Sequence, residues 1–241
     1  MEGNRVIRIK FNKLGLMKYI GHLDTQRYFQ RVIRRAGIDV AYSAGFSPHQ
    51  IMSFAQPLSV GVESRGEYFD LEVKSFTSSK DMIRLMNENA AEGGDVTGMS
   101  LLPERHEKAM ALVAYASYTL RFRPGHEPSF SLSEAVKKFN ESPSVRIMKK
   151  TKRSEKETEL KDLVRSLTIS EEDGEEVIKM TVSAASGENL KPSLLIKALR
   201  DLSCPGADPS VEFPGKTDLL ILREDLFDSE LKPLLSLGED F

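Results

Sequence analysis

Residues 5–37 read RVIRIKFNKLGLMKYIGHLDTQRYFQRVIRRAG, and a change of apolar period within this stretch predicts the fold class. At its start, apolar and polar side chains alternate, with Ile7 and Ile9 on the same side, which predicts a strand with one buried face. From His22 onward the apolar residues recur at helical spacing, and Gly37 is placed to end the helix. A strand followed by an amphipathic helix indicates a protein of mixed α and β structure.

The same patterns recur along the chain and predict two similar halves. Ser78 and Ser131 stand where helix caps are expected. Each half then reads strand, helix, strand, strand, helix, strand, which predicts an α+β fold of two tandem ferredoxin-like units with antiparallel sheets. After the first strand and helix, the expected strands are residues 39–43, 66–74, 98–104, 116–124, 162–170, 175–184 and 218–224, and the expected helices are 78–90, 131–142 and 191–202.

The expected domains are residues 1–108 and 109–241, with a charged insertion near 146–161 in the second. Each sheet should have one face under its helices and one face free. On the free face of the first sheet we expect charges from neighbouring strands, such as Arg8 and Asp70, to pair across the sheet. The alternative is an RNA platform of the aromatic-stacking type, for which this face offers a single aromatic residue, Tyr68.

The composition indicates a folded protein and excludes several classes of site. The hydrophobic fraction is 40% and the charged fraction 29%. No apolar run approaches the roughly 20 residues that a membrane span needs, and none at the start suggests a signal peptide. Cys204 is the only cysteine, which excludes an internal disulfide, an iron–sulfur cluster and a thiolate-rich zinc site. We therefore expect a cytoplasmic protein with no metal ion or other cofactor.

Charge is distributed unevenly, although the net charge is only −2. Between residues 5 and 35 nine side chains are basic, and Asp24 is the one acid. A helix start favours an anion through its free amides and its dipole, and nearby bases add to that field. The alternative is a solvated helix face on which Arg27 pairs with Asp24. The residues expected to bind nucleic acid or another anion are Lys13, Lys18, His22, Arg27, Arg31 and Arg34.

A loop-rich stretch, residues 45–64, follows the first helix and contains His49. In a right-handed crossover, the second strand ends at the sheet edge where the helix began, which predicts a shared crevice for His22 and His49. Two histidines could act as general acid and base in metal-independent RNA cleavage, but we favour structural roles for both. Together with Asp24 and Glu63 they form a weaker alternative, a metal site, because no spacing fixes the ligands. The expected pocket residues are Asp24, Ser43, Phe46, His49, Ser53 and Glu63.

The stretch from Tyr19 to Val73 resembles the signature of a known bacterial family. The matching elements are Gly21-His22-Leu23-Asp24, Arg34-Arg35-Ala36-Gly37, Tyr42-Ser43-Ala44-Gly45-Phe46-Ser47-Pro48-His49, Ser53-Phe54-Ala55 with Pro57-Leu58, Gly61-Val62-Glu63-Ser64 and Gly66-Glu67-Tyr68. This set is similar to a radical-SAM-associated domain of unknown function, which occurs alone or fused C-terminal to a radical SAM domain. The resemblance is close over residues 1–75 and only general in the second half.

The resemblance implies work alongside a radical SAM enzyme, many of which modify RNA, and it carries over no catalytic residues. The chain lacks the three-cysteine cluster motif, so it is not itself the radical enzyme. We expect a non-catalytic accessory module that binds RNA, with tRNA as one candidate, for a radical SAM partner. One alternative is an endoribonuclease that uses His22 and His49. Another is an adaptor that docks on the partner without touching RNA.

Overall fold

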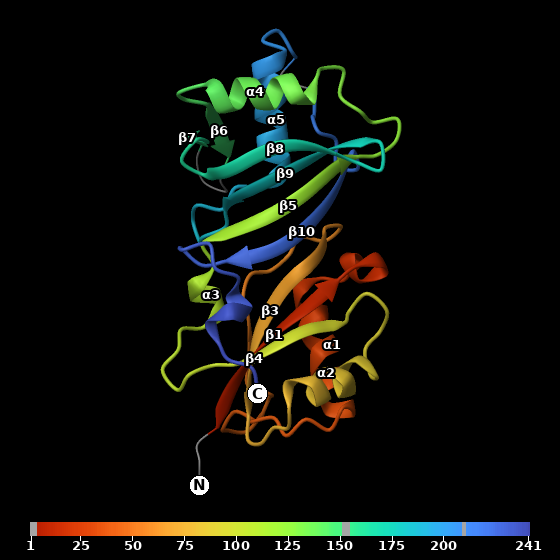
Figure 1. The fold of residues 1–241 in the computed structure, drawn as a ribbon, viewed down its shortest axis with the longest axis vertical. Coiled ribbons are helices and arrows are strands. Elements are labelled where there is room, and N and C mark those ends of the chain that lie inside the picture. The colour runs from red at the N-terminus through yellow and green to blue at the C-terminus, as the bar shows by residue number, and fades with distance from the viewer. Residues whose placement is uncertain (1–3, 151–154, 209–210) are drawn as a thin grey trace. The chain divides into compact units, whose positions relative to one another are not determined.

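The computed structural model describes residues 4–150, 155–208 and 211–241 (Figure 1). The chain folds into two compact units, one formed by Met1–Ala114 with Arg223–Phe241 and the other by Tyr115–Leu222. These units differ from the expected ranges, 1–108 and 109–241, chiefly because the end of the chain packs with the first unit. The fold is mixed α+β, and every strand pair whose register is defined is antiparallel.

The first unit is built on one antiparallel sheet. Its elements are β1 (Arg5–Lys13), η1 (Gly15–Tyr19), α1 (His22–Arg35), β2 (Met52–Phe54), β3 (Glu63–Val73), α2 (Ser79–Asn87), β4 (Val96–Leu101), α3 (Ala109–Leu112), the later part of β10 (Leu219–Phe227) and η2 (Leu234–Leu237). The strands lie in the order β4-β1-β3-β10, and the short β2 pairs with β3. Helices α1 and α2 therefore connect strands of one sheet and pack on it.

The alternation expected in the first strand is present in β1 and sets the core of this unit. Ile7, Ile9 and Phe11 are buried in a cluster with apolar residues of α1 and α2. Ile9 lies opposite Phe69 in the β1–β3 ladder, and the rings of Phe11 and Phe29 meet edge to face with their centroids 4.5 Å apart. The strand and the helix therefore pack on each other through the apolar residues that each of them turns toward the core.

The second strand differs from the expected one. Residues 39–43 make only isolated bridges, whereas Met52–Phe54, in the stretch expected to be a loop, forms β2. Both segments use the same edge of β3, since the Glu72 carbonyl accepts from the Ala41 N–H and the Glu72 N–H donates to the Ile51 carbonyl. The hydrogen bonds of this edge are therefore divided between two segments. The expected strand at 39–43 is wrong for that reason.

The second face of this sheet is covered, which corrects the expectation of a free face. Tyr68, expected there as an exposed aromatic, is only 1% accessible. α3 contacts β3, and η2 contacts β1 and β4, so both elements lie on the sheet. The expected pairing across the sheet is confirmed for Arg8 and Asp70, whose Nε and Oδ1 atoms are 2.8 Å apart. A covered face leaves no room for the stacking platform considered as an alternative.

The second unit has the same order of strands and helices with one added hairpin. Its elements are β5 (Tyr115–Phe122), α4 (Leu132–Glu141), β6 (Arg146–Lys150), β7 (Glu155–Glu159), β8 (Val164–Glu172), β9 (Glu175–Ser183), α5 (Pro192–Ser203) and the start of β10. β5, β9 and β8 lie side by side, and β6 pairs with β7 in a separate two-stranded sheet. The charged insertion near 146–161 is therefore a hairpin, and residues 151–154 within it lie outside the described residues.

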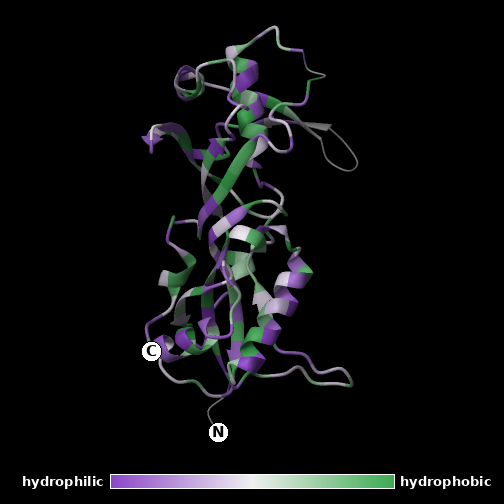
Figure 2. Ribbon diagram, turned by 90° about the vertical axis from the view of Figure 1, so that its right-hand side faces the viewer, coloured by the Kyte–Doolittle hydropathy of each residue, from purple (hydrophilic) through white to green (hydrophobic). Residues whose placement is uncertain are grey.

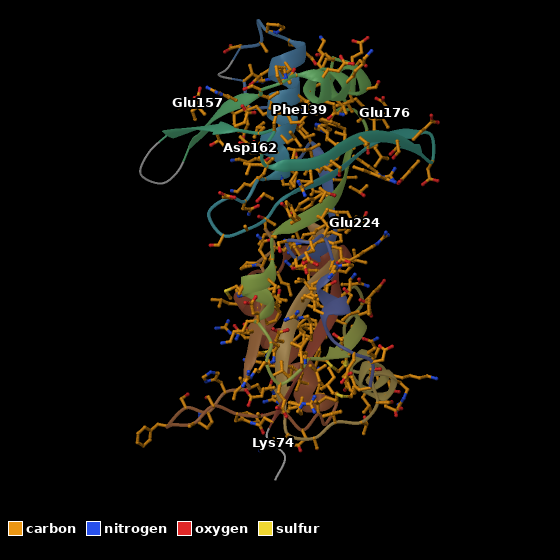
Figure 3. All side chains as sticks on the ribbon, turned by 60° about the vertical axis from the view of Figure 1, so that its left-hand side comes forward. Lys74, Phe139, Glu157, Asp162, Glu176 and Glu224 are labelled. Carbon is orange, nitrogen blue, oxygen red and sulfur yellow. The ribbon has the colours of Figure 1, made fainter. Side chains whose placement is uncertain are left out.

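Local sequence accounts for the turn between β8 and β9 in the second unit. The β8–β9 turn uses Asp173 and Gly174, both at positive φ, as a two-residue hairpin turn requires. Phe139 of α4 is 1% accessible and lies inside the unit (Figure 3).

Helices of the protein carry both hydrophobic and hydrophilic residues, as expected when one side of a helix rests on a sheet (Figure 2). No helix in the described part of the chain has the length and apolar character needed to cross a membrane.

Candidate nucleic-acid interface

Three arginines on one side of α1 form a wall of a depression that we call the basic groove. Arg27, Arg31 and Arg34 follow one another at spacings of four and three residues, so they share a helix face away from the buried Phe29. The groove has a volume of about 370 Å³. The residues that line it are Arg27, Gln30, Arg31, Arg34, Tyr42, Pro48, His49 and Gln50.

The other wall is the loop from Tyr42 to Gln50, and hydrogen bonds close its base. Tyr42 and Gln50 form an antiparallel bridge, and the Ser43 N–H donates to the His49 carbonyl at 2.9 Å. The His49 N–H donates in return to Ser43 Oγ at 3.1 Å. Gln50 Nε2 donates to the Gln30 carbonyl of α1 at 3.2 Å, which fastens the loop to the helix. The loop is therefore closed at its base by its own hydrogen bonds and joined to the helix wall by the bond from Gln50 to Gln30.

The groove is rich in exposed positive charge. Arg31 and Arg34 are exposed, and neither has a salt-bridge partner among the residues that the structure describes. Arg27 pairs with Asp24 at 3.2 Å, as their spacing predicts, and both side chains are more than half exposed. An exposed pair of this kind contributes about 0–1 kcal/mol and is screened by salt, so Arg27 can exchange Asp24 for a phosphate.

Two exposed aromatic residues accompany these arginines. Tyr42 lines the groove and is 49% accessible, and Phe46, farther along the same loop, is fully exposed at 111%. Burying a phenylalanine is worth about 1.5–3 kcal/mol, a stabilisation that Phe46 does not contribute to this fold. Single exposed apolar residues are common on proteins, but this one stands on a loop that is bonded to the helix carrying the three arginines of the groove.

The two loop lysines expected at this site lie elsewhere. Lys13 is 3% accessible at the end of β1, where burial lowers the pKa of its amine, Glu67 opposes that shift and Arg223 adds to it. Lys18 Nζ is 3.1 Å from Glu63 Oε1, so its charge is already paired. The expected anion site therefore separates into an arginine face on α1 and two lysines that are used within the fold.

The two histidines do not meet at the groove. His49 lines it, and its Nδ1 lies 2.9 Å from Ser43 Oγ. His22 begins α1, and its ring packs edge to face on Phe54 with the centroids 5.4 Å apart. Arg31 stands nine residues farther along the helix than His22, about 13 Å at 1.5 Å per residue. Within the described residues, the groove brings His49 to the arginines and not to His22.

The remaining expected pocket residues are dispersed. Ser53 lies in β2 opposite Asp70 of β3, and Glu63 also accepts a hydrogen bond from the Gly15 N–H at 3.0 Å. Across the described ranges, no group of three or more His, Cys, Asp or Glu side chains could hold a metal ion. The metal site considered as an alternative is therefore not formed by these residues.

Four groove residues were not among the predicted site residues: Gln30, Tyr42, Pro48 and Gln50. Gln30 had a signal, because it lies three residues after Arg27 on the same face of a predicted helix. Tyr42 and Gln50 had none, because they face the helix only through the bridge between the two ends of the loop.

Comparison with known proteins places the chain in a family. No curated protein matches it. One solved structure to which the chain is similar is titled "Crystal Structure of a Cbf5-Nop10-Gar1 Complex"; the match has 10% sequence identity and a TM-score of 0.46 and covers 92% of this chain. The match covers 50% of the length of the chain in that structure. Residues 6–192 match DUF2344, which is described as "Uncharacterized protein conserved in bacteria". The chain belongs to this bacterial family.

Proposed function

We propose that this protein is a non-catalytic module that binds RNA, and that the basic groove is its binding surface. The observation that supports this most is the exposed row of Arg27, Arg31 and Arg34 beside a loop bonded to the same helix. The row runs from Arg27 to Arg34, a rise of about 10 Å along the helix, which is long enough to face more than one phosphate. Guanidinium groups bind phosphate oxygens in pairs and keep their charge at any physiological pH.

The biological setting in this proposal comes from the sequence resemblance. The RNA would be presented to a radical SAM enzyme in the bacterial cytoplasm, with tRNA as one candidate. The tandem ferredoxin-like description is likewise our interpretation of the two element orders, in which β2 and β8 take equivalent places. The residues proposed to contact RNA are Arg27, Arg31, Arg34, Tyr42 and His49.

Neither alternative function gains support from a specific contact. An endoribonuclease using His22 and His49 needs both imidazoles at one reacting phosphate, and the described groove contains one of them. An adaptor would use a surface such as the β6–β7 hairpin, which carries Glu157 (Figure 3). Glu157 is already paired there with Arg146 at 3.4 Å. Among the described residues, Asp24 is the one acidic side chain that forms a salt bridge with the arginine row.

The test is the salt dependence of RNA binding. Affinity for a short single-stranded RNA should fall steeply as salt rises, because phosphate contacts release counterions. In the double variant Arg31→Ala, Arg34→Ala, affinity should fall and the slope of log K against log salt should shrink by about 1.4, or 0.7 for each lost contact. The matched control is Arg84→Ala, which removes an exposed arginine that pairs with Glu88 on α2.

Two results would contradict the proposal. One is no detectable RNA binding by the unaltered protein at low salt. The other is an equal loss of affinity in Arg84→Ala, since this would mean that net charge and not the groove determines binding.

A further inference from the structure

The loop of the basic groove presents a phenylalanine to solvent from a fixed base. Tyr42 and Gln50 bridge at the base, and Gly45, with φ +106, adopts a left-handed conformation that other residues rarely reach. Phe46 follows directly and is fully exposed. Within the described chain, no other aromatic ring packs on Phe46 or Tyr42. Tyr42 is thus half exposed among the arginines that line the groove, and Phe46 is fully exposed farther along the same loop.

Inside the groove, Gln50 has an unused hydrogen-bond acceptor. Its side chain is buried, at 6% accessibility, and its Nε2 donates to the Gln30 carbonyl. That bond fixes the orientation of the amide, because only the nitrogen can donate to a carbonyl. The opposite atom, Oε1, has no hydrogen-bond partner among the described residues. Buried acceptors are almost always paired, so this oxygen, which is shielded in the unbound protein, would gain a donor if a ligand carrying an N–H group opened it toward the groove.

These features together select among forms of RNA. A duplex stacks its base faces inside the helix, and its deep major groove admits no side chains, so exposed aromatic rings would find no base face to stack on. An unpaired nucleotide offers a base face for stacking, base edges with N–H donors and a phosphate for the arginines. We infer that the basic groove binds unpaired nucleotides, with Phe46 and Tyr42 stacking on bases and Gln50 accepting from a base edge. This inference rests on the proposed RNA binding.

A basic surface with an apolar loop could also dip into an anionic membrane. The loop residues next to Phe46 are Gly45 and Ser47, so a single large apolar side chain is available for insertion. Stable membrane attachment takes more than one weak signal of this size. A buried amide acceptor has no function in such insertion, whereas a base edge uses it. The observations therefore favour RNA.

The experiment compares two RNAs and two replacements of one residue. Fluorescence anisotropy measures the affinity of the full chain for a labelled 12-nucleotide single strand and for a duplex of the same sequence. The unaltered protein should prefer the single strand. Phe46→Ala should weaken single-strand binding about tenfold, the usual size of one lost stacking contact, and leave duplex binding unchanged. Phe46→Tyr keeps the ring and should bind both RNAs as the unaltered protein does.

Each result separates the inference from the proposed function. If neither RNA binds the unaltered protein at low salt, the proposed function fails. If RNA binds but the duplex is preferred, or Phe46→Ala binds the single strand normally, the inference fails and the proposed function stands. Sedimentation with phosphatidylglycerol vesicles that Phe46→Ala abolishes, with RNA binding unaffected, would assign the loop to membranes and overturn the inference. Because Phe46 is fully exposed, both variants should fold, and circular dichroism checks this.

Discussion

Arg8 and Arg31 come from the same basic stretch of the sequence, but the fold uses their charges in opposite ways. Arg8 is buried on β1 and donates to Asp70 through Nε at 2.8 Å and Nη2 at 3.1 Å. It also donates to the Glu107 carbonyl at 3.1 Å. Arg31 is exposed on α1 and lines the basic groove. The guanidinium of Arg8 is buried and paired within the protein, whereas that of Arg31 is available to a ligand.

Other basic side chains on the covered face of the first sheet are paired within the protein, as Arg8 is. Arg223 is 2% accessible, and its Nε donates to Glu67 Oε1 at 2.8 Å. Lys10 and the Tyr68 hydroxyl both donate to Asp225, and burial together with that carboxylate raises the pKa of Tyr68. A count of basic residues therefore overstates the charge that RNA can meet. Only the bases on the exposed helix face belong in that count.

The largest expected effect tests the buried group. In Asp70→Ala, Arg8 loses its carboxylate and the Ala109 N–H loses the acceptor it bonds at 2.8 Å. Breaking a buried pair on one side typically costs about 3–5 kcal/mol, so the first unit should unfold at much lower urea concentration. The double variant Arg8→Met, Asp70→Leu leaves no unpaired charge and should be more stable than Asp70→Ala. A single variant as stable as the unaltered protein would contradict the burial of this pair.

The next effect depends on pH. Burial lowers the pKa of Lys13 below its ordinary value of 10.5, so the unfolded chain binds this proton more tightly than the folded one. Stability from this residue is therefore present above pH 10.5 and is lost as the pH falls through the lowered folded value. The difference in urea midpoint between the unaltered protein and Lys13→Met should move in favour of the unaltered protein as pH rises toward 10.5. A difference independent of pH would show that Lys13 is solvated.

A smaller effect concerns the loop of the groove. Ser43→Ala removes the Oγ acceptor of the His49 N–H, a hydrogen bond worth about 1 kcal/mol. Hydrogen exchange at the His49 amide should become faster, and affinity for single-stranded RNA should fall by about fivefold, as that energy implies. Ser47→Ala is the matched control, because it makes the same change in the same loop and the Ser47 hydroxyl has no bond to His49. Equal effects of both variants would mean that the loop base does not depend on Ser43.

The smallest effect sharpens the contrast with Asp70→Ala. Arg34→Ala removes an exposed side chain without a salt bridge among the described residues, so unfolding free energy should change by no more than about 0.5 kcal/mol. Its effect should appear in RNA affinity alone. A loss of more than 1 kcal/mol in unfolding free energy would mean that Arg34, like Arg8, stabilises the fold.

The sequence by itself determined the local elements. Ser78 and Ser131 cap their helices as expected, with their Oγ atoms accepting from the Asp81 N–H at 3.1 Å and the Glu134 N–H at 3.2 Å. The alternation in β1 and the helical period of α1 also held, as did the pairing of Asp24 with Arg27. All of these depend on residues no more than a few positions apart, where periodicity and capping act.

Only the tertiary structure decided which charges are free. The cover of the first sheet comes from α3 and from the segment Arg223–Phe241, both far along the chain from β1, and it buries Arg8 and Tyr68 on a face that alternation left open. The basic groove likewise exists because Gln50 bonds back to α1 across 20 residues. Alternation and helical period report which side of an element is apolar, but burial of a polar side depends on what returns to cover it. That is set by contacts between distant parts of the chain, which no local pattern records.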